Sequence, residues 1–479
     1  MSLKKKTFSG ILWTMGDTFF VRALTFVAMI LLARWLGPTE FGLVGMIAVF
    51  IALGKSLTDS GMTNSLIRTK EPDETDFSTV FFVNLAMSLM VYGLVYIAAP
   101  IIAQFFSQPI LIKVIRLYCL IFLLIAFSAV QLAMLTKEMQ FNKITKINFP
   151  STAIGVTVGL YLGYYGYGVW SIVWMYLITE AVRSILLWVY SNWKPKFVFS
   201  KAKFKLHYKF GYKLMLSGLL DTIFKNIYNI LIGRFFTAQT LGYYERSKQF
   251  SEYPSSTLTQ VLGKVTYPML SEIQDDPGRL ENVYKKLIRI SFFIIAPLML
   301  GAAAIARPLF LLVLGEEWLP AVPFFQILCL AMMLYPIHAF NINILKVYGR
   351  SDLFLKLEII KKSIITITVI IAFQFGVLGL VWSSVFTSFA ALGVNMFYSS
   401  KLIHYPVPEQ IKDLSLTFIL SVVMGLLMYQ MINILPKSQL FLQLLIASCF
   451  GLIFYGAINY FYKKGPLHQA LVLLKTRNS

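Results

Sequence analysis

About fourteen apolar stretches, each long enough to cross a bilayer, follow one another along this 479-residue chain with only short breaks between them. A hydrocarbon core about 30 Å thick needs about 20 apolar residues per helix. By that measure, the predicted spans are residues 8–33, 41–58, 79–105, 113–136, 144–165, 168–191, 209–236, 241–270, 286–314, 321–345, 357–375, 377–400, 412–435 and 439–462. The sequence therefore predicts an all-α polytopic membrane protein with about 14 transmembrane helices.

The distribution of charge indicates how these helices are oriented. The chain has 43 Lys and Arg residues against 22 Asp and Glu residues, a formal net charge of +21. Such a basic chain could suggest a nucleic-acid-binding protein, but a hydrophobic content of 57% is too high for a soluble one. With the N-terminus inside, alternate loops and both ends collect most of the basic residues, which is the positive-inside pattern. We therefore predict cytoplasmic termini and no nucleic-acid partner.

An internal repeat divides the chain. The segment LLARWLGPTEFG (31–42) is matched by LIGRFFTAQTLG (231–242), with the same Leu, Arg and Gly at three equivalent positions. An even number of predicted helices separates the copies, so both units have the same orientation, as in transporters built from two parallel halves. We predict two pseudo-symmetric six-helix lobes around a central cavity. The predicted boundaries are an N-terminal lobe over 1–193, a basic cytoplasmic linker over 194–209, a C-terminal lobe over 210–400, and two extra helices with a cytoplasmic tail over 401–479.

Five segments are distinctive beyond their hydropathy. They are SLTDSGMTNSLIRT (56–69), GRFFTAQTLGYYERSKQF (233–250), VTYPMLSEIQDDPGRLENVYKKLIR (265–289), LGEEWLPAVPFFQILCLAMM (314–333) and KVYGRSDLFLK (346–356). They resemble the polysaccharide transport family, the Wzx-type flippases of the multidrug/oligosaccharidyl-lipid/polysaccharide exporter superfamily. The likeness is greatest to the lipopolysaccharide and exopolysaccharide export branch, which includes colanic-acid and teichuronic-acid exporters.

The resemblance implies a function and a place in the cell. It implies a flippase that moves an undecaprenyl-pyrophosphate-linked oligosaccharide, such as an O-antigen or exopolysaccharide repeat unit, across the bacterial inner (plasma) membrane by alternating access. Membrane lipids would surround the protein, and a polysaccharide polymerase or glycosyltransferases would be its partners.

Charged residues inside the spans are candidates for function because burying charge in a bilayer is costly. Three same-face pairs occur at helical spacing, and each could either neutralise itself or face a cavity. The helix over 209–236 opens the second lobe and should line the cavity. We therefore take Lys55 and Lys225 as candidate substrate ligands and Asp221 as a candidate ion-coupling residue. The pairs are Lys55/Asp59, Glu180/Arg183 and Asp221/Lys225.

Asp17 and Arg22 form a different pattern in the first span. Five residues apart, they lie about 140° apart around the helix, so they do not neutralise each other directly. Arg22 is the leading candidate ligand for the pyrophosphate or an acidic sugar, because a guanidinium offers two parallel donors and stays charged. A structural pair with another helix is the alternative. Asp17 is a second candidate ion-coupling residue.

The span over 241–270 is too polar to face lipid on all sides. It carries Glu245, Arg246, Lys248, Glu252 and Lys264. Lys248 shares one face with acidic residues three before and four after it, which favours a cavity-lining helix. Lys264 has no such local partner. Both lysines are candidate substrate-binding residues.

Enzymatic signatures are missing from the sequence. There is no GxxxxGK[ST] loop for an ATP motor, no nucleophile-plus-base arrangement, and no metal-like cluster among the four histidines. We therefore predict a protein that is not an enzyme and that holds no cofactor or metal. Without an ATP motor, coupling to a Na⁺ or H⁺ gradient is expected.

Two other transport functions stay open. A multidrug-type Na⁺/H⁺ antiporter of the same superfamily would usually have twelve spans and an acidic cation site. This chain has two more predicted spans and comparable numbers of basic and acidic residues within them, which favours an anionic lipid substrate. A flippase for peptidoglycan lipid precursors is a close relative that the sequence alone does not separate.

Overall fold

The computed structural model describes residues 3–59, 61–436 and 438–461. Regular structure in that part of the chain is helical throughout. The elements are α1 (Leu3–Asp59), α2 (Met62–Arg68), α3 (Glu74–Phe105), α4 (Leu111–Tyr118), α5 (Ile121–Lys137), α6 (Phe141–Tyr164), α7 (Val169–Tyr190), α8 (Lys201–Lys225), α9 (Ile227–Phe235), α10 (Ala238–Glu272), α11 (Pro277–Ala304), α12 (Ala306–Val313), the short 3₁₀ helix η1 (Glu316–Ala321), α13 (Val322–Met332), α14 (Tyr335–Val347), α15 (Ser351–Phe373), α16 (Gly376–Ser400), α17 (Val407–Ile434) and α18 (Leu440–Phe461).

The all-α polytopic fold class is confirmed. Within the described residues, nine stretches are long and apolar enough to cross a membrane: Phe19–Asp59, Glu74–Phe105, Leu111–Lys137, Val169–Tyr190, Pro277–Ala304, Glu316–Val347, Gly376–Ser400, Val407–Ile434 and Leu440–Phe461. The count of fourteen spans stays a prediction, because polar helices such as α8 and α10 do not meet this criterion and α1 holds two predicted spans.

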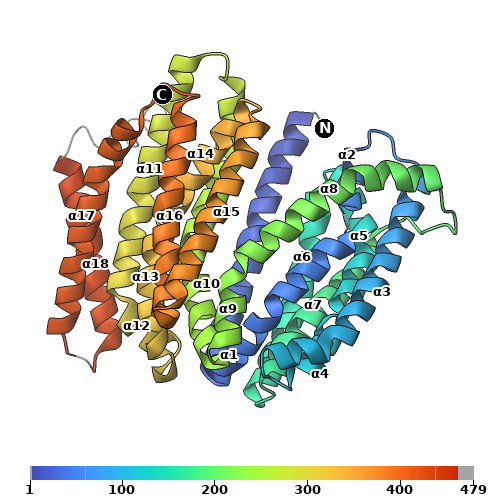
Figure 1. The fold of residues 1–479 in the computed structure, drawn as a ribbon, viewed down its shortest axis with the longest axis horizontal. Coiled ribbons are helices and arrows are strands. Elements are labelled where there is room, and N and C mark those ends of the chain that lie inside the picture. Colours follow the sequence, from blue (N-terminus) through green and yellow to red (C-terminus); the bar gives the residue numbers. More distant parts are fainter. Residues whose placement is uncertain (1–2, 60, 437, 462–479) are drawn as a thin grey trace. The chain divides into compact units, whose positions relative to one another are not determined.

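The two predicted spans within α1 meet at a turn. Gly37 has φ 72° and ψ 175°, outside the helical region, and Pro38 follows it. A positive φ suits glycine because it has no side chain to clash with the backbone. Figure 1 shows α1 running away from the N-terminus and turning back within the helix. The Gly-Pro pair therefore ends one transmembrane leg and begins the next.

The chain forms two compact units, residues 1–242 (unit 1) and 243–479 (unit 2). In unit 1, α6 packs closely along α7, because the small residues Gly155 and Gly159 leave room for the α7 backbone. In unit 2, α11 packs along α17, and α15 along α16. The lobe boundaries predicted from the repeat remain predictions.

The two copies of the repeat lie against each other in unit 1. A Cβ added at Gly42 would overlap the backbone of Ala238, and one added at Gly242 would overlap the backbone of Pro38. Positions 38 and 238 are themselves equivalent in the two copies. The contact is therefore reciprocal, as in a two-fold interface in which one patch meets its own copy.

Candidate functional site

Two cavities inside the helix bundle of unit 1 share a charged wall. Their volumes are about 350 and 260 Å³, and Lys55, Glu180 and Arg183 line both of them. The larger cavity is completed by Thr58, Asp59, Thr63, Asn84, Ile125, Ala126, Ser128, Ala129, Leu132 and Leu187. Because charged groups rarely enter a membrane-spanning bundle without a role, this pair of cavities is the candidate functional site.

The charges of this site come from two helices. Within α7, Arg183 NH1 lies 3.3 Å from Glu180 Oε1, so this predicted pair is formed. Lys55 on α1 interacts electrostatically with Glu180 and Arg183 across the bundle. Asp59 does not form an ion pair with Lys55 among the described residues, and its carboxylate instead accepts hydrogen bonds from Thr63. The site therefore holds two basic and two acidic groups from α1 and α7.

Two buried polar atoms of the larger cavity have no protein partner in the described part of the chain. They are Thr58 Oγ1 and Asn84 Oδ1, and both side chains are almost completely buried. An unsatisfied buried polar group costs about 1–3 kcal/mol, so such groups usually meet water or a ligand. The cavity is therefore suited to a small polar occupant, such as a water molecule or a cation.

The smaller cavity is also polar. Its wall includes Thr25, Asn148, Ser151, Thr152, Tyr176 and Thr179, in addition to the shared charged residues. Arg22 follows a lining residue, Val21, on α1 and is half-buried and engaged with other groups. Arg22, the leading candidate from the sequence, is thus the next residue in the chain after one that lines this cavity.

The other predicted site residues lie elsewhere. On α8, Lys225 Nζ lies 2.7 Å from Asp221 Oδ2, with side chains 73% and 43% exposed, so this predicted pair is formed. Lys248 in unit 2 lies over the ring of Tyr244, at 5.9 Å. The side chains of Asp17 and Lys264 fall outside the described residues. Of the seven candidates, Lys55 is the one whose described side chain lines the unit 1 cavities.

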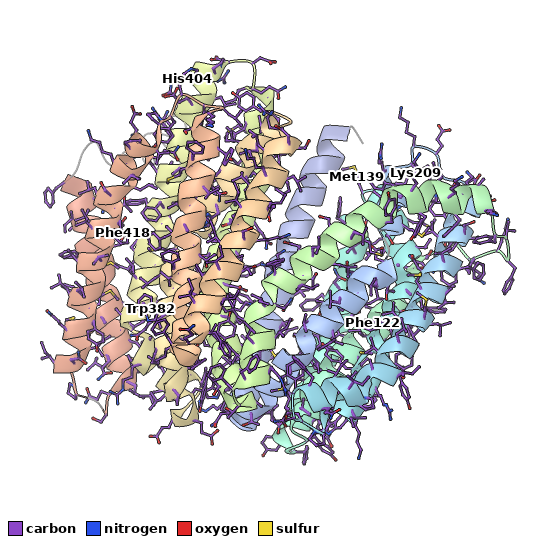
Figure 2. The ribbon with its side chains drawn as sticks, in the orientation of Figure 1. Phe122, Met139, Lys209, Trp382, His404 and Phe418 are labelled. Carbon is purple, nitrogen blue, oxygen red and sulfur yellow. The ribbon has the colours of Figure 1, made fainter. Side chains whose placement is uncertain are left out.

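Sequence reasoning missed the uncharged part of the site. Asn84 interrupts an apolar run within a predicted span, and this polar residue was a signal available in the sequence. Thr58 lies at the end of its predicted span beside Asp59 and gave no such signal. Their burial depends on how α1 and α3 are rotated. Unit 2 offers a contrast, since its two described cavities, about 400 and 800 Å³, are mainly apolar around Trp382 (Figure 2).

Comparisons with known proteins agree with the sequence motifs. Residues 31–323 match the model of a family described as "Polysaccharide biosynthesis protein". The chain is 27% identical to the lipopolysaccharide biosynthesis protein WzxC of Escherichia coli (strain K12), over 78% of this chain and 76% of that protein. It is 26% identical to the teichuronic acid biosynthesis protein TuaB of Bacillus subtilis (strain 168), over 74% and 73%.

Solved structures show the same fold. The lipid II flippase MurJ in an inward closed conformation has a TM-score of 0.77 at 17% identity, covering 95% of this chain and 99% of MurJ. An inward-facing multidrug resistance MATE transporter of the MOP superfamily has a TM-score of 0.59 at 18% identity, covering 78% and 94%. At these identities the likeness concerns the fold. The family model spans more than half of the chain, and the chain therefore belongs to the polysaccharide biosynthesis protein family.

Proposed function

We propose that this protein is a flippase that moves an undecaprenyl-pyrophosphate-linked oligosaccharide from the inner to the outer leaflet of a bacterial plasma membrane. The family match over residues 31–323 carries this proposal. Relatives with matching names support it: WzxC, TuaB and the succinoglycan biosynthesis transport protein ExoT of Rhizobium meliloti (strain 1021), 25% identical over 64% of this chain. It would be a transporter rather than an enzyme, working alongside polysaccharide polymerases or glycosyltransferases.

The substrate sets the physical problem. A pyrophosphate and a string of sugars must cross a hydrocarbon core about 30 Å thick, and each unsatisfied polar group there costs several kcal/mol. The protein must therefore supply a polar path with cationic groups. The proposed ligands are Arg22, Lys55, Lys225, Lys248 and Lys264. Alternating access of the two predicted lobes is the proposed motion.

We infer that the charged cavities of unit 1 couple transport to Na⁺ or H⁺. The carboxylates of Asp59 and Glu180 can take up a cation or a proton, and the free oxygens of Thr58 and Asn84 are hard ligands of the kind Na⁺ prefers. Lys55 and Arg183 keep the site neutral overall when it is empty. Asp17 and Asp221 remain the second pair of candidate coupling residues.

The decisive experiment is a gene deletion followed by lipid extraction and mass spectrometry. We expect undecaprenyl-linked oligosaccharide to accumulate, and its mass would identify the glycan. Accumulated peptidoglycan precursor would instead support the second flippase function, and unchanged lipids with increased drug sensitivity would support the multidrug alternative. Either result would contradict the proposal.

Complementation of the deletion strain with variant genes then tests Arg22 as a proposed substrate ligand. Arg22→Ala should abolish surface polysaccharide while leaving the amount of protein in the membrane unchanged. Arg34→Ala is the matched control, since Arg34 lies on the same leg of α1 but is exposed near the turn at Gly37. Normal polysaccharide in the Arg22 variant would exclude this arginine as a substrate ligand.

Topology is a separate part of the proposal. With cytoplasmic termini, cysteines placed at Pro109 and Lys437 should react with a membrane-impermeant label from outside the cell, and one at Lys201 should not. Labelling in the opposite sense would overturn the proposed orientation.

A further inference from the structure

The segment before and within the start of α8 is basic and exposed. Residues 194–209 contain six lysines and no Asp or Glu. Two of the lysines meet carboxylates: Lys196 pairs with Glu74, and Lys203 with Asp73 and Asp76. The other four have no carboxylate within 4 Å among the described residues; these are Lys194, Lys201, Lys205 and Lys209. The segment therefore presents a net positive surface.

A buried polar network fixes this segment to the end of unit 1. Asp76 is buried at the start of α3, and His207 of α8 donates from Nε2 to its Oδ1 over 3.0 Å. His207 Nδ1 accepts from the hydroxyl of Ser65 on α2 over 2.9 Å. Lys203 Nζ lies 2.8 Å from Asp76 Oδ2. Two helices, α2 and α3, thus hold one face of α8 in place.

The opposite face of α8 carries the free lysines. Lys201, Lys205 and Lys209 follow one another at four-residue spacing, so they form a stripe within about 80° of the helix surface. The anchoring residues Lys203 and His207 point away from this stripe, at about 200° and 240° from Lys201. Figure 1 shows the first turns of α8 lying across the end of unit 1, and Figure 2 shows Lys209 at the same end as Met139.

Large apolar side chains are exposed beside the lysines. Phe197 is 97% exposed, Phe199 58% and Leu206 57%. A helix lying in the membrane interface combines these features, since its lysines meet anionic headgroups while apolar side chains enter the acyl boundary. Exposed aromatic rings would otherwise be an unfavourable choice for a surface in water.

We propose that residues 194–209 form a binding surface for the headgroups of anionic phospholipids in the surrounding bilayer. The lysine stripe supplies the charge, Phe197, Phe199 and Leu206 supply insertion into the interface, and the Asp76 network holds both in one orientation. Each lysine near an anionic membrane surface contributes a factor of roughly five in binding. The surface therefore distinguishes anionic lipids from zwitterionic ones and does not depend on which substrate the protein carries.

The test uses the full-length protein in neutral detergent, titrated with phosphatidylglycerol or phosphatidylcholine. Bound lipids are counted by native mass spectrometry. We expect the wild type to prefer phosphatidylglycerol and to lose that preference in 1 M salt, where charges are screened within about 3 Å. The combined variant Lys201→Gln, Lys205→Gln, Lys209→Gln should bind phosphatidylglycerol on the order of 100-fold more weakly. Its melting temperature without lipid should equal that of the wild type, because all three side chains are exposed.

A second triple variant makes the test specific. Lys286→Gln, Lys356→Gln and Lys412→Gln remove the same charge from exposed positions of unit 2 and should leave phosphatidylglycerol binding close to that of the wild type. The proposal is overturned if this control loses as much affinity as the α8 variant, or if the wild type binds both lipids equally. It is also overturned if the α8 variant keeps its lipid binding, as expected if the surface served an acidic protein.

Discussion

Substitution of either repeat glycine by alanine should destabilise unit 1 through a backbone clash. A Cβ at Gly42 would lie 2.5 Å from the carbonyl carbon of Ala238 and overlap its oxygen. A Cβ at Gly242 would lie 2.7 Å from the carbonyl carbon of Pro38 and overlap its oxygen. Carbon atoms in contact usually lie about 3.5–4.0 Å apart, so the two segments would have to separate by about 1 Å.

The size of the effect follows from what obstructs the new methyl group. Overpacking a well-packed interior costs about 1–3 kcal/mol, and the upper end applies here because a backbone cannot rotate away as a side chain can. Against this cost, alanine is about 1 kcal/mol more favourable than glycine inside a helix. We therefore expect Gly42→Ala and Gly242→Ala each to lower the free energy of unfolding by about 2 kcal/mol. Because both glycines lie in one contact, the double variant should lose less than the sum.

Gly93→Ala is the matched control. Gly93 lies inside α3, and a Cβ there would meet nothing within 4 Å. This substitution should raise stability by up to about 1 kcal/mol. The assay is thermal unfolding of the purified protein in detergent, with all four variants compared. The reasoning would be refuted if Gly42→Ala and Gly93→Ala shifted the melting temperature in the same direction, or if the effects in the double variant were fully additive.

Three further predictions concern contacts at the ends of unit 1. Glu40→Gln should cost about 1 kcal/mol in thermal unfolding, because the Glu40 carboxylate accepts a 2.7 Å hydrogen bond from the N–H of Val169 at the start of α7. Asp76→Asn should cost about 1–3 kcal/mol, because it removes the charge that accepts from Lys203 and His207, although Lys203 keeps its second partner Asp73, and limited proteolysis of 194–209 should accelerate. The pKa of Asp73 is held below its ordinary 3.8 mainly by the Asp76 backbone N–H, and that of Lys203 is raised above 10.5 mainly by the Asp76 carboxylate. The stability that Asp73 adds is therefore lost as pH falls below 3.8, and the stability that Lys203 adds is lost as pH rises above 10.5. Proteolysis of 194–209 should be faster outside these limits than at neutral pH.

Local signals in the sequence predicted several parts of the fold. The repeat indicated that positions 42 and 242 are equivalent, and the structure shows them in a reciprocal contact. Asp73 caps the start of α3 with a capping box, which depends on residues within one turn and can therefore be recognised in the sequence. The contact between the two copies joins residues far apart in the chain, so the sequence indicated their equivalence but not their contact.

The arrangement of charges was harder to predict because it depends on helix rotation. Glu180 and Arg183 pair as their spacing suggests, since both lie on α7. Lys55 and Asp59 have equally suitable spacing, yet Lys55 interacts with α7 and Asp59 with Thr63. Spacing within one helix indicates which side chains can form a pair. Packing between helices determines whether another residue replaces that partner.

The charged pairs also differ in what they imply about water. Lys225 and Asp221 form an ion pair although both are substantially exposed, and their helix is flanked by predicted membrane spans. Exposed charge is not stable against hydrocarbon, so within a bilayer this face of α8 does not face lipid directly. Lys55 and Glu180 instead line cavities within unit 1, and the Glu180 side chain is largely buried. In the proposed ion-coupled flippase, the exposed pair on α8 would suit the large polar substrate, and the cavities of unit 1 would suit the small coupling ion.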